Sequence, residues 1–355
     1  MKITWVLPQN YDIPVGGYKI VFQYANHLVS IGHNVRIIFL QNPSYEQNSG
    51  LYRFGRSIYW YLFHKNPFKK TVTWFPLDSK IEIDWNISAH QMNFDQDEKV
   101  IATAFWTANA VNRANIPSEN KYYFIQDYEV FSGSEEDVDK TWQLPLKKFS
   151  VSTWLSDFGR EKFDQSIIVI PNFLDDRDEF GVTNPIEMRQ HTIALLNHPS
   201  KRKNTKLGLD IIQLVKEKVP DLTVKLFGTE EFSIQNDSFI EYFRQPTRIQ
   251  LRDNIYNQAM IYLLPSEYEG WGLTAMEAMA SGDIVVSNDN GGVNDFIKNG
   301  ENGFILDFGK IDVVVDKIVE LLRNKDTEIA NTASHITESY SVAKSTELLV
   351  QYLTD

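Results

Sequence analysis

Two glutamates, Glu269 and Glu277, flank a glycine-containing stretch with seven residues between them. Ionised carboxylates accept hydrogen bonds from neighbouring hydroxyl groups, which suits them to sugars. Gly270 and Gly272 lie between the two acids. Because glycine has no Cβ, the backbone there can turn sharply and a ligand can come close. These residue types at this spacing suit a ligand with hydroxyl groups on both sides of a phosphate, as in a nucleotide sugar.

The segments around this stretch are expected to form a strand, a loop, a helix and a second strand, with the ligand end in the loop. Apolar runs at 261–264 and 284–286 predict buried strands, and residues 273–280 have helix-forming composition. The N–H groups at the helix start, around Leu273 and Thr274, would face an anion, and the helix dipole adds to the attraction. The helix start is therefore the expected site of a diphosphate.

The two acids are then expected to have separate roles. Glu269 lies in the loop and would hold the sugar, whereas Glu277 lies about one turn into the helix and would bind the ribose. An ordinary α/β turn is the alternative, because helix starts are enriched in acidic residues.

The run from Pro265 to Gly292 resembles the donor-site signature of retaining glycosyltransferases of family 4, which also has two glutamates separated by seven residues. The matching residues are Pro265, Ser266, Glu269, Gly270, Gly272, Leu273, Glu277, Ala278, Met279, Ala280, Gly282, Gly291 and Gly292. Two residues depart from the family, Trp271 in place of Phe and Asp283 in place of Pro. The resemblance implies the α/β fold called GT-B. This fold has two Rossmann-like domains whose parallel sheets face each other across a cleft, and a C-terminal helix that packs back on the N-terminal domain.

A leaving diphosphate needs positive charge, and the basic loop 198–203 is the best supply. The family carries an Arg and, five residues later, a Lys in this loop. Lys203 takes the Lys position, and His198 falls where Arg is expected. Either His198 contributes a weaker positive charge, or Arg202 replaces the missing Arg. A solvated basic loop is the alternative without a ligand.

Two further candidate groups lie in the first half of the chain. Gly16 and Gly17 follow the strand predicted at 3–7, where they form either a tight turn or an anion contact. The resemblance places such a pair near the donor diphosphate and the acceptor. Asp127 follows the strand predicted at 122–125, and either orients or deprotonates the acceptor hydroxyl or caps its own loop.

The resemblance therefore implies two sets of site residues. The catalytic candidates are Glu269, Lys203, Arg202 and Asp127. The donor-binding candidates are Gly16, Gly17, His198, Gly270, Trp271, Gly272, Leu273, Thr274 and Glu277.

Strands and helices alternate along all 355 residues, which suits two α/β domains. The Pro171–Asn172 pair and the polar run after it predict a boundary near residue 174. We expect an N-terminal acceptor-binding domain at 1–174, joined by the C-terminal helix 340–355. The nucleotide-sugar donor-binding domain is expected at 175–339.

Composition narrows the class of protein. The net charge of −12 argues against nucleic-acid binding, and the lack of cysteine excludes thiolate metal sites. Asp-x-Asp triplets begin at Asp95, Asp137 and Asp176, but none directly ends an apolar run, so solvated loops explain them. We expect no metal and no cofactor other than the donor substrate. With no signal peptide or membrane span predicted, the expected location is the cytoplasm.

The segment Leu51–Lys70 is basic and aromatic in an otherwise acidic chain. One expectation is that it contacts anionic lipid at the inner face of the plasma membrane, which suits a lipid-linked acceptor. The alternative is that it covers the acceptor site, with its basic side chains reaching into water.

The predicted function is transfer of a hexosyl or deoxyhexosyl group, such as rhamnosyl or glucosyl, from a nucleotide diphosphate sugar to a saccharide acceptor with retention. Segments around Ala102–Trp106 and Tyr122–Glu129 look like those of bacterial rhamnosyltransferases, which points to surface-polysaccharide assembly. A GT-B nucleotide-sugar epimerase and a non-catalytic saccharide-binding or partner-regulating protein are the alternatives. An NAD-linked oxidoreductase ranks below them, because the first loop is not GxGxxG.

Overall fold

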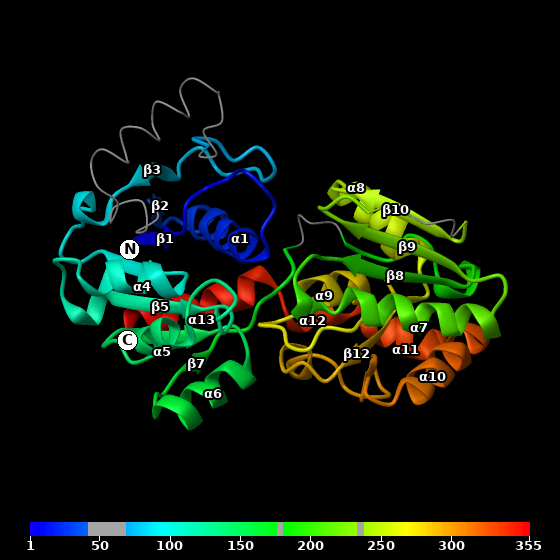
Figure 1. Ribbon diagram of the computed structural model, residues 1–355. Coiled ribbons are helices and arrows are strands. Elements are labelled where there is room, and N and C mark those ends of the chain that lie inside the picture. Colours follow the sequence, from blue (N-terminus) through cyan, green and yellow to red (C-terminus); the bar gives the residue numbers. More distant parts are fainter. Residues whose placement is uncertain (42–68, 176–179, 233–237) are drawn as a thin grey trace, which may run out of the picture. The chain divides into compact units, whose positions relative to one another are not determined.

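The computed structural model describes residues 1–41, 69–175, 180–232 and 238–355. The chain divides into two compact units (Figure 1). Unit 1 comprises Met1–Asn172 and Val342–Asp355, and unit 2 comprises Phe173–Ser341. Each unit contains one sheet with helices on it, which confirms the predicted α/β class with two Rossmann-like domains.

Unit 1 contains a seven-stranded sheet in the order β3-β2-β1-β4-β5-β6-β7. All pairings between these strands are parallel. The strands are β1 (Lys2–Leu7), β2 (Asn34–Leu40), β3 (Glu82–Ile87), β4 (Lys99–Ala102), β5 (Lys121–Ile125), β6 (Lys147–Ser150) and β7 (Ile168–Val169). Residues 3–7 of the central β1 are all buried, as expected of a strand covered on both faces.

Among the described residues of unit 1, the α-helices are α1 (Gly16–Ser30), α4 (Phe105–Asn112), α5 (Glu135–Trp142), α6 (Thr153–Phe163) and α13 (Val342–Thr354). The C-terminal α13 packs against α1. Ser345 Oγ donates to the carbonyl of Pro171 at 2.8 Å, and Tyr352 Oη donates to the carbonyl of Lys148 at 3.0 Å. The last helix therefore belongs to the N-terminal unit, as predicted.

Unit 2 contains a six-stranded sheet in the order β10-β9-β8-β11-β12-β13, again with parallel pairings. The strands are β8 (Thr192–Asn197), β9 (Thr223–Gly228), β10 (Ile240–Arg244), β11 (Ile261–Leu264), β12 (Ile284–Asn288) and β13 (Phe304–Leu306). The α-helices are α7 (Thr205–Lys218), α8 (Arg248–Gln250), α9 (Leu273–Ala280), α10 (Ile311–Asn324), α11 (Thr327–Ser334) and α12 (Ile336–Ser339).

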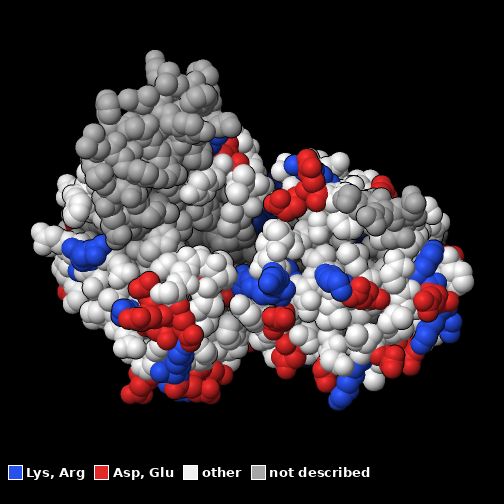
Figure 2. All heavy atoms as spheres, viewed as in Figure 1, with Lys and Arg blue, Asp and Glu red and all other residues white. Residues whose placement is uncertain are grey.

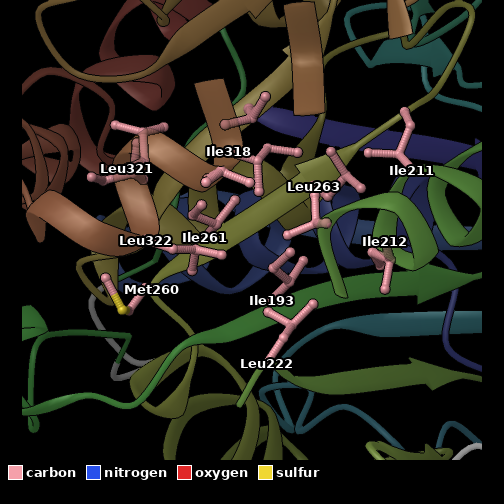
Figure 3. Close-up of a cluster of buried hydrophobic side chains, with 14 of the residues drawn as sticks. Ile193, Ile211, Ile212, Leu222, Met260, Ile261, Leu263, Ile318, Leu321 and Leu322 are labelled. Carbon is pink, nitrogen blue, oxygen red and sulfur yellow. The ribbon is translucent and has the colours of Figure 1, made fainter. Parts of the chain in front are cut away.

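The hydrophobic core on one face of this sheet holds β11 in place (Figure 3). Ile261 and Leu263 of β11 point to the same face because side chains alternate along a strand. There they meet side chains of α7, such as Ile212, and of α10, such as Ile318 and Leu322. Each buried aliphatic side chain contributes roughly 1.5–3 kcal/mol of transfer free energy. The loop that follows β11 therefore begins from a rigid strand end.

Both ends of unit 2 lie together. The amide of Leu174 donates to the carbonyl of Tyr340 at 3.3 Å, and Leu174 forms an isolated parallel bridge with Ser341. Residues 173–341 thus leave and rejoin the rest of the chain at neighbouring points.

The sequence of residues 247–257 predicts a single α-helix, but the structure has three short helical turns there. The segment continues from α8 into a π-helical turn at Leu251–Ile255 and a 3₁₀ turn at Tyr256–Gln258. Arg189 donates to the carbonyl of Tyr256, and Asn184 Nδ2 donates to that of Asn257. These side-chain donors occupy the last carbonyls and stabilise the irregular turns. Strands β3 and β13 were not predicted, because β3 alternates polar with apolar residues and β13 is only three residues long, so neither contains an apolar run of four.

Candidate active site

Three loops meet at the carboxyl edge of the unit 2 sheet, because β8, β11 and β12 are adjacent and parallel. The loop after β11 lies between the other two. Its Glu267 amide donates to the carbonyl of Arg202 at 2.8 Å, and its Glu269 amide donates to the carbonyl of Asn290 at 3.0 Å. The β11 loop is therefore fixed through its backbone on both sides.

Glycines allow this loop to turn into α9. Gly272 is the N-cap of the helix at φ 103° and ψ 51°, a left-handed conformation that favours glycine. Gly292 lies against the same loop, and a Cβ on it would stand 2.7 Å from the carbonyl oxygens of Glu269 and Trp271. No side chain caps α9 within the described chain, so the N–H groups of its first turn point toward the loop without a capping acceptor. Leu273 and Thr274 thus lie at a helix start, as predicted from the sequence, and the binding of an anion there stays a prediction.

Lys203 and Glu269 form the closest charged contact of the site. Lys203 Nζ donates to both carboxylate oxygens of Glu269 at 2.6 Å. The side chains are 17% and 8% exposed, respectively, so solvent screens this pair weakly. Lys203 ends the 3₁₀ turn Lys201–Lys203 after β8, and Asn204, with φ 51°, leads into α7. Two residues 66 positions apart are thus joined at one sheet edge.

The side chains of His198 and Arg202 make different contacts. The Ser200 amide donates to His198 Nδ1 at 3.1 Å, so the neutral ring carries its proton on Nε2. Burial lowers the pKa of His198, and the positive charges of Lys203 and Arg202 lower it further. The imidazole is therefore a neutral donor at neutral pH. Arg202 instead lies over the ring of Tyr268, with its Cζ 5.3 Å from the ring centroid.

Glu277 and Thr274 of α9 each accept a hydrogen bond from a buried tyrosine. Tyr256 Oη donates to Glu277 Oε2 at 3.3 Å, and Tyr262 Oη donates to Thr274 Oγ1 at 2.8 Å. Glu277 is only 7% exposed. Neither tyrosine could be recognised from the sequence, because a Tyr inside an apolar strand or helix has the same pattern as any core residue.

Trp271 lies in an aromatic cluster beside Gly270 and Gly272. Its ring centroid is 5.1 Å from that of Phe296 and 5.4 Å from that of Tyr340. Trp271 is buried, and its Nε1 has no hydrogen-bond partner among the described residues. The larger ring in place of the family's Phe thus fills apolar space.

In unit 1, Gly17 lies against the end of β5. A Cβ on Gly17 would stand 3.2 Å from the side-chain amide group of Gln126, so a larger residue would press on that side chain. Gly16 begins α1 next to it. Asp127 Oδ1 accepts a bond from the Tyr128 amide at 2.8 Å, which is the loop-capping contact considered from the sequence. Gly16, Gly17 and Asp127 therefore share the carboxyl edge of the first sheet.

The Asp-x-Asp triplets are engaged in local contacts where they are described. Asp95 pairs with Lys2 at 2.8 Å, Asp137 caps the start of α5 with Ser134, and Asp139 pairs with Lys162. The second triplet lies in a helix and not in a loop as expected. The third triplet, Asp176–Asp178, lies outside the described residues. Within the described ranges, no three His, Asp or Glu side chains are grouped as a metal site would require.

The basic segment Leu51–Lys70 lies outside the described residues except for Lys69 and Lys70. Elsewhere in the described chain, none of the helices combines the length and apolar character that a membrane crossing requires. On the face shown in Figure 2, acidic and basic side chains of the described residues are interspersed, without a broad basic surface of the kind that binds nucleic acid.

Two doubly wound parallel-sheet units define the GT-B class of architecture, and in the second unit Glu269 and Glu277 lie on either side of the start of α9. Comparison with known families agrees. Residues 176–338, which are most of unit 2, match the family described as "Glycosyl transferases group 1".

Among curated proteins, the chain is 23% identical over 238 residues to poly(glycerol-phosphate) alpha-glucosyltransferase of Bacillus subtilis (strain 168), covering 62% of this chain and 34% of that protein. It is 26% identical over 208 residues to N-acetyl-alpha-D-glucosaminyl L-malate synthase of Bacillus anthracis, covering 54% of each. It is 25% identical over 202 residues to poly(ribitol-phosphate) alpha-N-acetylglucosaminyltransferase of Staphylococcus aureus (strain COL), covering 51% of this chain and 40% of that protein. The chain thus spans between about a third and about half of these relatives.

Solved structures share the fold along the whole chain. A mutant of S. aureus TarM in complex with fondaparinux, alpha-GlcNAc-glycerol and UDP superposes with a TM-score of 0.74 at 13% identity and full coverage of both chains. Anabaena Alr3699/HepE in complex with UDP-glucose gives 0.71 at 16% identity, also with full coverage of both.

Proposed function

We propose that the protein is a retaining glycosyltransferase that moves a hexosyl or deoxyhexosyl group from a nucleotide diphosphate sugar to a saccharide acceptor. The observation that carries this proposal is the Lys203–Glu269 contact, in which the ammonium lies 2.6 Å from both carboxylate oxygens beside the start of α9. Lys203 and the start of α9 suit a phosphate, and Glu269 suits the hydroxyl groups of a sugar. The match of this unit to the group 1 family supports the same chemistry.

Each group then has a role on the donor. Lys203 and the first-turn amides of Leu273 and Thr274 bind the diphosphate, with Gly270 and Gly272 leaving room for it. His198 adds a neutral N–H donor, and Arg202 adds charge from the rim of the loop. Glu269 accepts bonds from the donor sugar, and Glu277 accepts bonds from the ribose hydroxyls.

In the proposed reaction, the acceptor oxygen attacks the anomeric carbon on the face from which the diphosphate leaves. The bond from that carbon to the phosphate oxygen breaks, and the new glycosidic bond forms. The acceptor proton passes to the departing phosphate oxygen, and the configuration is retained. Lys203 and the helix start stabilise the negative charge that develops on the leaving group, without a metal ion.

Unit 1 is proposed to bind the acceptor at the carboxyl edge of its sheet, where Gly16, Gly17 and Asp127 lie. Relatives named for poly(glycerol-phosphate) and poly(ribitol-phosphate) support a bacterial surface polymer, or a lipid-linked precursor of one, as the acceptor. A lipid-linked acceptor would suit a cytoplasmic location with peripheral contact at the inner face of the plasma membrane, and we include this location in the proposal.

The first experiment is a thermal-shift screen with UDP, dTDP, GDP and ADP, followed by activity with the matching sugar nucleotides. Lys203→Ala and Glu269→Ala should each lower turnover by about a hundredfold or more, because each removes a charged contact to the donor. Lys201→Ala and Glu267→Ala are matched controls, since both residues are exposed neighbours in the same two loops. Near-normal turnover in both site variants would contradict the proposal, and donor conversion without any acceptor would indicate an epimerase.

A further inference from the structure

Two buried tyrosines lie beneath the helix that carries the proposed donor contacts. Tyr262 belongs to β11, and Tyr256 belongs to the 3₁₀ turn before it. Both are fully buried. Their rings meet edge to face with centroids 5.9 Å apart, and the ring of Phe227 lies 5.7 Å from that of Tyr256. Arg189 donates to the backbone carbonyl of Tyr256, which further fixes its position.

Each hydroxyl reaches one polar side chain of α9. Tyr256 Oη lies 3.3 Å from Glu277 Oε2, and Tyr262 Oη lies 2.8 Å from Thr274 Oγ1. Thr274 and Glu277 are three positions apart, so they share one face of the helix. Burial raises the pKa of both tyrosines well above the usual value, with neighbouring acids such as Glu277 adding to the effect. Both phenols therefore stay protonated and act as donors.

The direction of these bonds has a chemical consequence. A carboxylate has about four lone-pair sites, so Glu277 can accept from Tyr256 and still accept from two vicinal hydroxyls. A threonine hydroxyl has one proton, and because Tyr262 donates to Thr274 Oγ1, that proton is left to point at an acceptor such as a phosphate oxygen. The two tyrosines thus orient one acceptor group and one donor group on the same helix.

We infer that Tyr256 and Tyr262 are positioning residues that govern separate parts of the nucleotide. Tyr256 orients Glu277 for the ribose hydroxyls, and Tyr262 orients Thr274 for the diphosphate. Neither touches the ligand. This inference depends on the proposed function, which assigns the ribose to Glu277 and the diphosphate to the start of α9.

Calorimetry on the full-length chain tests the separation. Wild type, Tyr256→Phe and Tyr262→Phe are titrated with UDP, GDP and ADP. The tightest binder is then compared with its 2′-deoxy and 3′-deoxy analogues and with its monophosphate. The two variants are matched, because each loses one hydroxyl from a fully buried ring. Thermal unfolding checks that both are folded.

Wild type should bind the ribonucleoside diphosphate about tenfold or more tightly than a deoxy analogue, since a hydrogen bond to a charged group is lost. In Tyr256→Phe that ratio should fall to about threefold or less, while the preference for the diphosphate over the monophosphate stays at the wild-type value. In Tyr262→Phe the ratio of diphosphate to monophosphate affinity should change. The ratio of ribonucleotide to deoxy-analogue affinity should stay at the wild-type value.

Two results would overturn the inference while leaving the proposed function intact. One is a wild-type deoxy ratio retained in Tyr256→Phe. The other is a parallel loss of both preferences in both variants, which would indicate a general packing role. A wild-type chain that binds neither these three diphosphates nor dTDP would overturn the proposed function and this inference together.

Discussion

Removing the charge of Glu269 should tighten the binding of a nucleoside diphosphate even as it impairs sugar transfer. In the structure, the carboxylate holds the Lys203 ammonium with both oxygens at 2.6 Å. At an effective dielectric constant of about 20, two unit charges at that distance attract by about 6 kcal/mol before desolvation is counted. A diphosphate that takes Lys203 must compete with this internal partner.

Glu269→Gln keeps the size of the side chain and one carbonyl acceptor but removes the negative charge. Most of the gross attraction is offset by desolvation of the pair, so the net gain for the diphosphate should be about 1.4 kcal/mol, or about tenfold in Kd. Turnover with the sugar nucleotide should nevertheless fall, because the charged contact to the sugar is lost.

Isothermal titration with the nucleoside diphosphate that binds wild type measures this directly. Glu267→Gln is the control, since it makes the same change at an exposed position two residues away in the same loop and should leave Kd within about twofold. Equal or weaker diphosphate binding by Glu269→Gln would refute the view that Lys203 is shared between the carboxylate and the phosphate.

Two other predictions concern stability and can be measured by urea unfolding. Arg189→Met should lower the unfolding free energy by about 3–5 kcal/mol, because the fully buried guanidinium pairs with Asp283 and also bonds backbone carbonyls. Lys310→Met, at an exposed pair with Asp307, should change it by less than about 1 kcal/mol, and similar losses in the two variants would contradict the role of the buried pair. For Lys148, burial lowers the folded-state pKa from 10.5 to about 8. Between these pH values the unfolded chain therefore keeps the Lys148 proton, whereas the folded chain has released it. The unfolding free energy of wild type relative to Lys148→Met should then rise from pH 8 to 10 by about 1 kcal/mol or more. A difference that does not change with pH would show that Lys148 keeps its proton.

Much of the fold could be predicted because its strands are short apolar runs between turn residues. The run at 261–264 is β11 to the residue, and 273–280 is α9. The edge strand β3 could not be found in this way. Its sequence EIDWNI alternates polar with apolar residues and so contains no apolar run, and its position depends on pairing with the distant β2.

The residues of the candidate site could be predicted from the sequence more readily than the contacts between them. Glu269, Glu277 and Lys203 were identified through the resemblance, yet the bidentate bond between Lys203 and Glu269 depends on two loops that meet only when β8 and β11 pair. Tyr256 and Tyr262 carried no local signal. Their hydroxyl partners lie 21 and 12 residues away, and an aromatic residue in an apolar run is the usual content of a core.

The meeting of Leu174 and Tyr340 makes the second unit an insert in the chain of the first. A segment whose two ends are neighbours can be replaced as one cassette, because only a single pair of adjacent junctions has to be rejoined. Recombination between related genes at these junctions would exchange the second unit while the first unit keeps its own closing helix. Under the proposed function, lineages with this connectivity would pair a new activated sugar with an old acceptor in one genetic event.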